Sequence, residues 1–293
     1  MKIQVNGVHL YFDVEGAGLR PSTDIMVEKP TLILLHGGPG VDHTGFKPLF
    51  SSMVDIAQVI YLDHRGNGRS EWGSESDWTL SQWADDLHGF CLALGIEKPV
   101  VYGSSFGGMV ALAYATRHPE HPGKLVLVST TAQAASHTDA KVAMFTKLGG
   151  PRAGELAHRR FVVGDTSPEV LRDWVDVALP LYTQAGPDLS AWQRQHFNQR
   201  VREWFYRQGG EGRDFDLLAT LKHIQCETLV LGGALDPMIP IECQRDIASA
   251  IPKTLVEDHE FPNCGHGVFA DAREPAMQAL RAFIERPLQK VAQ

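Results

Sequence analysis

Long apolar runs are missing from this sequence of 293 residues. No stretch approaches the roughly 20 consecutive apolar residues that a membrane-spanning helix needs. Residues 1–16 alternate polar and apolar side chains and lack the apolar core of a signal peptide. These absences predict a cytoplasmic protein with no membrane partner.

Clusters of positive charge are missing as well. The sequence has 27 Lys and Arg residues against 35 Asp and Glu residues, a formal net charge of −8, and no run of basic residues. Nucleic acids are polyanions, and the surfaces that bind them carry basic stripes. We therefore expect no nucleic-acid partner.

Cysteine is scarce, and its spacing does not suggest a metal site. The four cysteines show neither C-x-x-C nor Cys/His ligand spacing, which predicts reduced thiols. We expect no metal ion and no other cofactor, and we expect the partner to be a small-molecule substrate. The cysteines are Cys91, Cys226, Cys243 and Cys264.

What the sequence does contain is a regular alternation of short apolar strands and helical patterns. A strand that is apolar throughout is buried on both faces, as in a mostly parallel sheet flanked by helices, so the predicted fold class is α/β. Before this alternation, Asn6-Gly7 between Ile3–Val5 and Val8–Val14 predicts a β-hairpin. The expected strands are Thr31–Leu35, Ala57–Leu62, Pro99–Tyr102, Leu125–Ser129, Thr228–Gly232 and a short one near Thr254–Val256, and the expected helices are Thr79–Leu94, Phe106–His118, Ile241–Ala250 and Glu274–Arg286.

One segment interrupts the alternation. From 132 to 223 the sequence shows helical patterns over Lys141–Leu148, Pro168–Leu181 and Ser190–Arg207, and no convincing strand. Tryptophans on these patterns can bury apolar surface of their own. We expect residues 1–131 and 224–293 to form a core domain, with residues 132–223 as a helical insertion between two of its strands.

The stretch Gly103–Gly107, GSSFG, lies between an expected strand and an expected helix and fits the pattern G-x-S-x-G. In that pattern the serine stands on a strained turn, and large side chains two residues before or after it would collide with the strand and the helix. Ser105 has glycine at both places, whereas Ser104 has Tyr102 and Phe106 there. We predict that Ser105 is a nucleophile.

A serine nucleophile needs a base, and the base needs an acid to orient it. In this arrangement the chain order is serine, acid, histidine. Asp236 follows a late expected strand, and His266 stands between two glycines ahead of the last helix, so we predict these two as acid and base. The rival His259 lies in a charged stretch that indicates a solvated loop, and the rival acids Asp214 and Asp216 are interpreted as helix caps.

The sequence HGGPG at 36–40 directly follows an expected apolar strand. Acyl transfer develops negative charge on an oxygen, which backbone N–H groups can stabilise. Glycines let the main chain approach a substrate closely. We predict the N–H groups of Gly38 and Phe106 as oxyanion donors, and Gly37 as a residue that contacts the substrate.

Five motifs in this order, LLHGGPG, YLDHRGNGRS, GSSFGG, GALDP and NCGH, resemble those of α/β-hydrolases, and specifically those of the proline iminopeptidase family. The resemblance covers nearly the whole chain outside the helical insertion. It implies Ser105, Asp236 and His266 as a catalytic triad, with the insertion as a helical cap over the site. It also implies that Asp63 and Arg65 brace the HGGPG loop through charge-assisted hydrogen bonds. The alternative for this pair is a surface ion pair.

The chain departs from this family in two places. Phe106 stands where the family usually has Trp, and Gln193 follows Trp192 where the family's cap carries a Trp/Glu motif that holds the substrate's α-ammonium group. Release of N-terminal proline or a similar residue from small peptides is the first hypothesis. Carboxylesterase or lactonase activity on the same triad is the alternative, and a non-catalytic ligand-binding protein is a third.

The expected helix Ser190–Arg207 offers a replacement for the missing carboxylate. Trp192, His196 and Glu203 stand at i, i+4 and i+11 and would share one stripe of that helix. If the stripe faces the site, all three bind substrate, with Trp192 as an apolar wall and Glu203 as the partner of the α-ammonium group. The alternative is that Glu203 is solvated beside Arg202.

Overall fold

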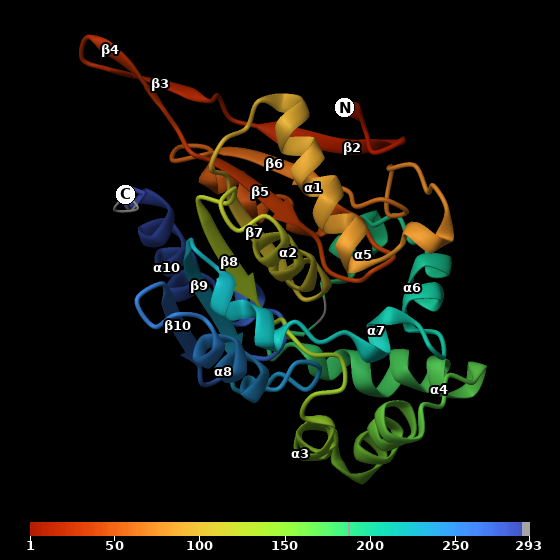
Figure 1. Ribbon diagram of the computed structural model, residues 1–293. Coiled ribbons are helices and arrows are strands. Elements are labelled where there is room, and N and C mark those ends of the chain that lie inside the picture. Colours follow the sequence, from red (N-terminus) through yellow and green to blue (C-terminus); the bar gives the residue numbers. More distant parts are fainter. Residues whose placement is uncertain (187, 289–293) are drawn as a thin grey trace.

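The computed structural model describes residues 1–186 and 188–288. Within them, an eight-stranded sheet runs through the molecule with helices on both faces (Figure 1). The first two strands are antiparallel to their neighbours and the other six are parallel, which confirms the predicted fold class. In spatial order the strands are β1 (Lys2–Val5), β2 (Val8–Glu15), β6 (Gln58–Leu62), β5 (Thr31–Leu35), β7 (Val100–Ser104), β8 (Lys124–Val128), β9 (Glu227–Gly233) and β10 (Val256–Phe261).

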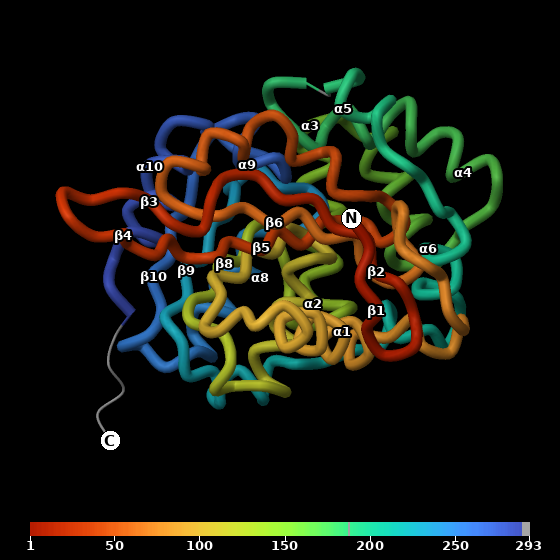
Figure 2. Tube along the Cα trace, turned by 90° about the horizontal axis from the view of Figure 1, so that it is seen from above, coloured from red at the N-terminus to blue at the C-terminus, as the bar shows by residue number. Residues whose placement is uncertain are grey.

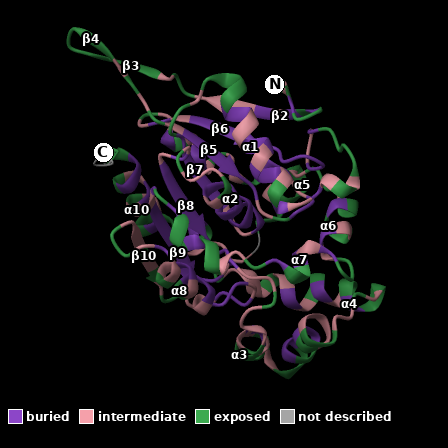
Figure 3. Cartoon of the chain, in the orientation of Figure 1, coloured by how far each residue is buried: buried purple, intermediate pink, exposed green. Residues whose placement is uncertain are grey.

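Alternate side chains of the central strands enter different cores, because successive residues of a strand point to opposite faces. Ile33 of β5 belongs to the core that contains α1 (Leu80–Leu94) and α2 (Phe106–Arg117), whereas Leu32 belongs to the core under α10 (Arg273–Glu285). Helices therefore cover both faces, and the strands are buried along most of their length (Figure 3).

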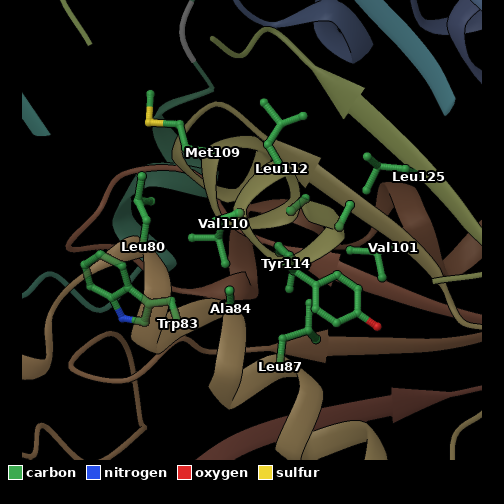
Figure 4. Packing of buried hydrophobic residues seen from close by; sticks show 14 of the residues in the cluster. Leu80, Trp83, Ala84, Leu87, Val101, Met109, Val110, Leu112, Tyr114 and Leu125 are labelled. Carbon is green, nitrogen blue, oxygen red and sulfur yellow. The ribbon is translucent and has the colours of Figure 1, made fainter. Parts of the chain in front are cut away.

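The contact between α1 and α2 is the densest part of the first core. Trp83 and Leu87 of α1 lie close to Val110 and Tyr114 of α2, as Figure 4 shows. α2 is apolar on almost every side and has ten buried residues, so it is enclosed between the sheet and α1. This packing fixes the start of α2, where the motif GSSFG lies.

A two-stranded hairpin of β3 (Leu19–Ser22) and β4 (Ile25–Glu28) projects away from the body of the molecule (Figure 1). The sequence analysis assigned no structure to this stretch. Its residues are almost all exposed, so it carries no alternation of buried and exposed side chains that would mark a strand.

The helical segment, residues 132–223, lies beyond the carboxyl ends of the strands, and its helices are grouped on one side of the molecule (Figure 1 and Figure 2). It has a core of its own that contains Phe145, Leu156 and Trp174. Its helices are α3 (Thr138–His158), α4 (Pro168–Asp173), α5 (Leu189–Arg194), α6 (Gln199–Tyr206) and α7 (Glu211–Asp214), joined by helical turns that include Arg159–Val163, Trp174–Ala178 and Leu179–Tyr182.

The expected single helix over Ser190–Arg207 is wrong, since α5 and α6 are separate helices. The chain breaks at Asn198, whose backbone is extended and whose side chain caps α6 by accepting a hydrogen bond from the Arg200 N–H at 3.2 Å. Trp192 and Glu203 fall on different helices and do not share one stripe.

The stretch around His259 is a strand, and the predicted solvated loop is wrong. β10 lies at the edge of the sheet, and its residues alternate between partly buried and exposed. An edge strand tolerates charged side chains, so its composition resembles that of a loop. The short strand expected near Thr254–Val256 therefore begins only at Val256.

The four cysteines are buried, and none forms a disulfide. No helix in the described parts of the chain is long and apolar enough to cross a membrane. In the same ranges, no group of three or more His, Cys, Asp or Glu side chains could hold a metal ion.

Candidate active site

Ser105 stands on a sharp turn between β7 and α2. Its φ of 53° and ψ of −117° lie outside the conformations that a residue with a side chain ordinarily adopts. The Ser105 N–H donates to the Val128 carbonyl of β8 at 2.9 Å, and the Ser105 carbonyl accepts from the Thr130 hydroxyl at 2.7 Å. A Cβ on Gly103 or on Gly107 would overlap neighbouring backbone, so the predicted need for small residues at both places is confirmed.

His266 and Asp236 meet in the loops that follow β10 and β9. Nδ1 of His266 lies 2.7 Å from Oδ2 of Asp236. The Asp236 side chain is 1% exposed, and its other oxygen accepts from the N–H groups of Met238 at 2.8 Å and Ile239 at 2.9 Å. These contacts orient the imidazole and leave its Nε2, on a side chain that is 19% exposed, as the nitrogen able to exchange a proton.

The rival histidine and acids are engaged elsewhere. His259 pairs through Nε2 with Glu257 of the same strand at 2.7 Å. Asp216 accepts from the Leu218 N–H at 2.9 Å, but the N-cap of the helical turn Leu218–His223 is Leu217, so Asp216 is not its cap as predicted. The prediction that Asp214 is a cap is wrong, because Asp214 is the last residue of the short helix α7.

Tyr182 of the helical segment holds the loop that carries His266. The His266 N–H donates to the Tyr182 carbonyl at 2.6 Å, and the two rings lie edge to face with centroids 5.8 Å apart. The Leu235 N–H donates to the Cys264 carbonyl at 2.8 Å, which ties the histidine loop to the aspartate loop. Sequence reasoning missed Tyr182, because no motif marks it and its contact joins residues far apart in the chain.

The two predicted oxyanion donors lie in segments next to Ser105, since Phe106 follows it in the chain and Gly38 follows Gly37. Phe106 is the first residue of α2, so its N–H has no acceptor within the helix and lies at the positive end of the helix dipole. The Gly38 N–H makes no hydrogen bond with any residue that the structure describes. A Cβ on Gly37 would lie 3.5 Å from the Ser105 Cβ, which places the HGGPG loop beside the serine.

The Phe106 side chain, which stands where the family usually has Trp, points into the core. It is fully buried, with its ring 4.9 Å from that of Trp83 and 5.5 Å from that of Phe205 in α6. The backbone of Phe106 is therefore the part that borders the site, and its ring joins the helical segment to α1 and α2.

Two side chains that sequence reasoning missed hold the HGGPG loop. Nδ1 of His36 lies 2.8 Å from the Gly37 carbonyl, and Oδ1 of Asn67 accepts from the Gly40 N–H at 2.6 Å. Burial lowers the pKa of His36, so its imidazole is neutral, and because a carbonyl only accepts, Nδ1 carries the hydrogen. The signal was present in the motifs, since His36 opens HGGPG and Asn67 lies in YLDHRGNGRS.

Asp63 and Arg65 do not brace this loop as the resemblance implied. Asp63 accepts from the His43 N–H at 2.9 Å and lies 2.7 Å from its Nδ1. Arg65 forms a bidentate ion pair with Asp86, at 2.7 and 2.8 Å. Both residues are buried, so the alternative of a surface ion pair is also wrong. A buried charge needs a partner, and each of the two finds one away from the loop.

The predicted substrate-binding residues of the helical segment are not brought together. Trp192 is 39% exposed and packs on Phe197, with ring centroids 6.1 Å apart. His196 is exposed in the break between α5 and α6. Glu203 is exposed and accepts from the Gln199 side chain at 2.6 Å, in agreement with the alternative that it is solvated.

Asn198, the N-cap of α6, contacts the HGGPG loop. Its N–H donates to the Gly40 carbonyl at 2.8 Å, and its side-chain amide donates to the Gly66 carbonyl at 2.6 Å. One residue of the helical segment is thus bonded both to the HGGPG loop and to the neighbouring loop after β6.

The chain belongs to the α/β-hydrolase fold family, whose model matches residues 30–272. It is similar to the proline iminopeptidase of Clostridium botulinum, with 26% identity over 88% of this chain and 90% of that protein. It is also similar to a 2-hydroxymuconate semialdehyde hydrolase of Pseudomonas putida, with 29% identity over 93% of each. The crystal structure of proline iminopeptidase from Mycobacterium smegmatis has the same fold, with a TM-score of 0.78, 20% identity and 97% of each chain covered.

These comparisons support hydrolase activity and confirm the resemblance to proline iminopeptidases. Relatives of near-equal identity are named for different substrates. The substrate of this chain therefore has to be argued from its own residues.

Proposed function

We propose that this chain is a serine hydrolase that cleaves a small ester or amide through an acyl-enzyme on Ser105. The observation that carries the proposal is a serine on a strained strand-to-helix turn, together with an imidazole whose Nδ1 is held 2.7 Å from a buried carboxylate. A serine hydroxyl is a weak nucleophile until a positioned base removes its proton.

In this mechanism, Nε2 of His266 takes the proton of the Ser105 hydroxyl as its oxygen attacks the carbonyl carbon. Asp236 stabilises the imidazolium that forms. The N–H groups of Gly38 and Phe106 donate to the oxygen that becomes negative. His266 then gives its proton to the departing alcohol or amine, and the same imidazole deprotonates the water that releases the acid from Ser105.

We propose further that residues 132–223 are a cap on a core made of residues 1–131 and 224–293. The support comes from Asn198, which bonds to the HGGPG loop, and from Tyr182, which bonds to the histidine loop. A segment attached to both loops limits the size of a molecule that enters between them. This favours a small substrate.

Two substrate classes fit this chemistry. Similarity to proline iminopeptidases supports the release of N-terminal proline from small peptides. That activity requires an anionic partner for the substrate's α-ammonium group, and Glu203 is exposed and bonded to Gln199. A carboxylesterase or lactonase needs no such partner. We therefore place ester or lactone cleavage first and the aminopeptidase second.

Kinetics on a substrate panel test the proposal. We expect the wild type to hydrolyse 4-nitrophenyl butyrate or an N-acyl lactone with a higher kcat/KM than proline 4-nitroanilide. Asp236→Asn should lower kcat by about 10³–10⁴ with little change in KM, because the imidazole loses its orientation. Asp258→Asn, at an exposed acid of β10, is the matched control and should keep the wild-type kcat. No turnover of any ester, lactone or anilide, or an unchanged kcat in Asp236→Asn, would contradict the proposal.

A further inference from the structure

Three arginines of the helical segment, Arg160, Arg172 and Arg202, have guanidinium groups without a polar partner among the described residues, and Arg160 and Arg202 are the two that lie near the loops of the site. Neither Arg160, in the turn after α3, nor Arg202, in α6, makes a side-chain hydrogen bond or an ion pair with any described residue. Nη1 of Arg160 is fully buried as well. A buried cation without a partner is costly, so Nη1 of Arg160 lacks a polar partner that its burial calls for.

A short chain of contacts connects Arg160 to the catalytic histidine. The Arg160 guanidinium lies over the Trp174 ring, 4.5 Å from its centroid. Nε1 of Trp174 donates to the Tyr182 hydroxyl at 2.9 Å, and the Tyr182 carbonyl accepts from the His266 N–H. Stacking satisfies the face of the guanidinium, but its N–H donors lie in its plane and remain unused.

Arg202 borders the HGGPG loop. Its Cβ would lie 3.4 Å from a Cβ on Gly40, next to the point where Asn198 bonds to that glycine. Arg202 is exposed, so its long side chain is not fixed by packing. Arg160 is therefore linked to the histidine loop through Trp174 and Tyr182, and Arg202 lies beside the HGGPG loop.

The electrostatics agree with this placement. Burial lowers the pKa of Arg160, and the positive charge of Arg202 lowers it further. The buried hydroxyls of Tyr182 and Tyr206 lie within the field of both arginines. No carboxylate is among the main influences on Arg160. The positive charges of Arg202 and Arg213 thus oppose the charged form of Arg160, and a bound anion would relieve this repulsion.

We propose that Arg160 and Arg202 bind an oxyanionic group, a carboxylate or a phosphate, on the molecule that Ser105 attacks. The inference rests on the proposed serine-hydrolase function and narrows its substrate class to anionic esters, lactones or amides. Arginine suits this role because its planar fork of donors matches the two oxygens of a carboxylate or phosphate. Such a site repels the α-ammonium group that a peptide with free N-terminal proline would bring.

A matched pair of esters tests the selectivity. Mono-4-nitrophenyl adipate carries a free carboxylate, and 4-nitrophenyl hexanoate has the same acyl length without it. We expect the ratio of kcat/KM values, anionic over neutral, to exceed one in the wild type and to fall about tenfold or more in Arg160→Gln and in Arg202→Gln. Arg152→Gln, at a 73% exposed arginine of the same segment, is the control and should keep the wild-type ratio.

A binding experiment separates this inference from the hydrolase proposal. Calorimetric titration of Ser105→Ala with adipate and with inorganic phosphate measures the anion site without turnover. We expect at least one of the two to bind, and its affinity to fall about tenfold or more when Arg202→Gln is added. If Arg160→Gln does not fold, Arg202→Gln, at an exposed residue, still gives both measurements, the ratio of kcat/KM values and the affinity for the anion. An unchanged ester ratio in Arg202→Gln, or no binding of either anion to Ser105→Ala, overturns the inference. Loss of ester turnover alone would overturn only the hydrolase proposal.

Discussion

Ser105 shows how far a single residue's backbone is constrained by its neighbours. The turn requires glycine at 103 and at 107, because the backbones of the strand and the helix lie so close there that a Cβ would overlap backbone atoms. This part of the site could be predicted from the sequence, since the constraint is local and leaves the pattern G-x-S-x-G. The order of nucleophile, acid and base is likewise readable along the chain.

The first prediction concerns Gly107. A Cβ there would overlap the Leu35 carbonyl of β5, which cannot move without disturbing the sheet. We expect Gly107→Ala to lower the free energy of unfolding by about 1–3 kcal/mol, the range usual for overpacking, and to lower kcat as well. Gly18→Ala is the control, because a Cβ there would meet only the Gln58 side chain at 3.6 Å or more, and it should change stability by less than about 0.5 kcal/mol. Equal stability of the two variants in urea unfolding would contradict the packing argument.

The second prediction is a pH dependence of stability that arises at His64. Burial lowers the pKa of His64 well below its usual value, and the neighbouring His36 adds to this. Below about pH 6.5 the unfolded chain binds a proton at His64 that the folded chain does not, so stability is lost as the pH falls. The loss should approach about 1.4 kcal/mol per pH unit for this group.

Urea unfolding between pH 7 and pH 5 checks this prediction. His64→Gln should reduce the loss of stability by up to about 1.4 kcal/mol per pH unit, the contribution of one proton. This reduction is expected whatever the effect of the substitution on stability at pH 7. His223→Gln, at an exposed histidine, should leave the slope as in the wild type. A wild-type slope in His64→Gln would contradict the prediction, because it would show that His64 binds protons equally in the folded and unfolded chains.

Other residues of the site could not be found by sequence reasoning. Tyr182 and Asn198 act through backbone groups that contact loops distant in the chain, and such contacts leave no pattern in the residue types. Arg160 also gives no signal, because an arginine in an amphipathic segment is normally solvated. Its lack of partners is visible only when the neighbours are known.

At the scale of elements, periodicity predicted the strands and helices of the sheet layer but failed at α5 and α6. Helical spacing continues through residues 195–198, so nothing in the sequence marks a break. The break occurs because Asn198 bonds to Gly40 and Gly66, and these tertiary hydrogen bonds require an extended backbone at that residue. The prediction for β10 was also wrong, because an edge strand tolerates charged side chains and its composition then resembles that of a loop.

The third prediction tests this role of Asn198. Asn198→Ala removes the cap of α6 and the hydrogen bond to Gly66, which should cost about 1–2 kcal/mol of stability. We also expect kcat/KM on a neutral ester to fall about threefold to tenfold. The backbone N–H of residue 198 still donates to the Gly40 carbonyl, but without the side-chain bond to Gly66 it holds the HGGPG loop less firmly, and small displacements near an oxyanion site are costly.

Ser167→Ala is the matched control. Ser167 caps α4 by accepting from the Val170 N–H, and its side chain has no bond to the HGGPG loop. It should lose comparable stability and keep its kcat/KM. The same loss of activity in both variants would mean that general loosening of the helical segment, and not the anchoring of residue 198 at Gly66, lowers activity.

At the scale of the whole molecule, the described residues form three hydrophobic cores next to the loops at the carboxyl ends of the strands. Two cores lie on the faces of the sheet, and the third lies within the helical segment. The alternation of strands and helices predicted the first two. The alternation could not predict the position of the third core, because amphipathic spacing shows that a helix buries one face but not which element covers that face.

The fourth prediction tests the central claim, that Ser105 is the residue that becomes acylated. The protein is incubated with a fluorophosphonate probe, digested, and mapped by mass spectrometry. We expect a single adduct on Ser105, no labelling of Ser105→Ala, and labelling of Ser104→Ala at a rate close to that of the wild type. An adduct on Ser104, or undiminished labelling of Ser105→Ala, would contradict the account.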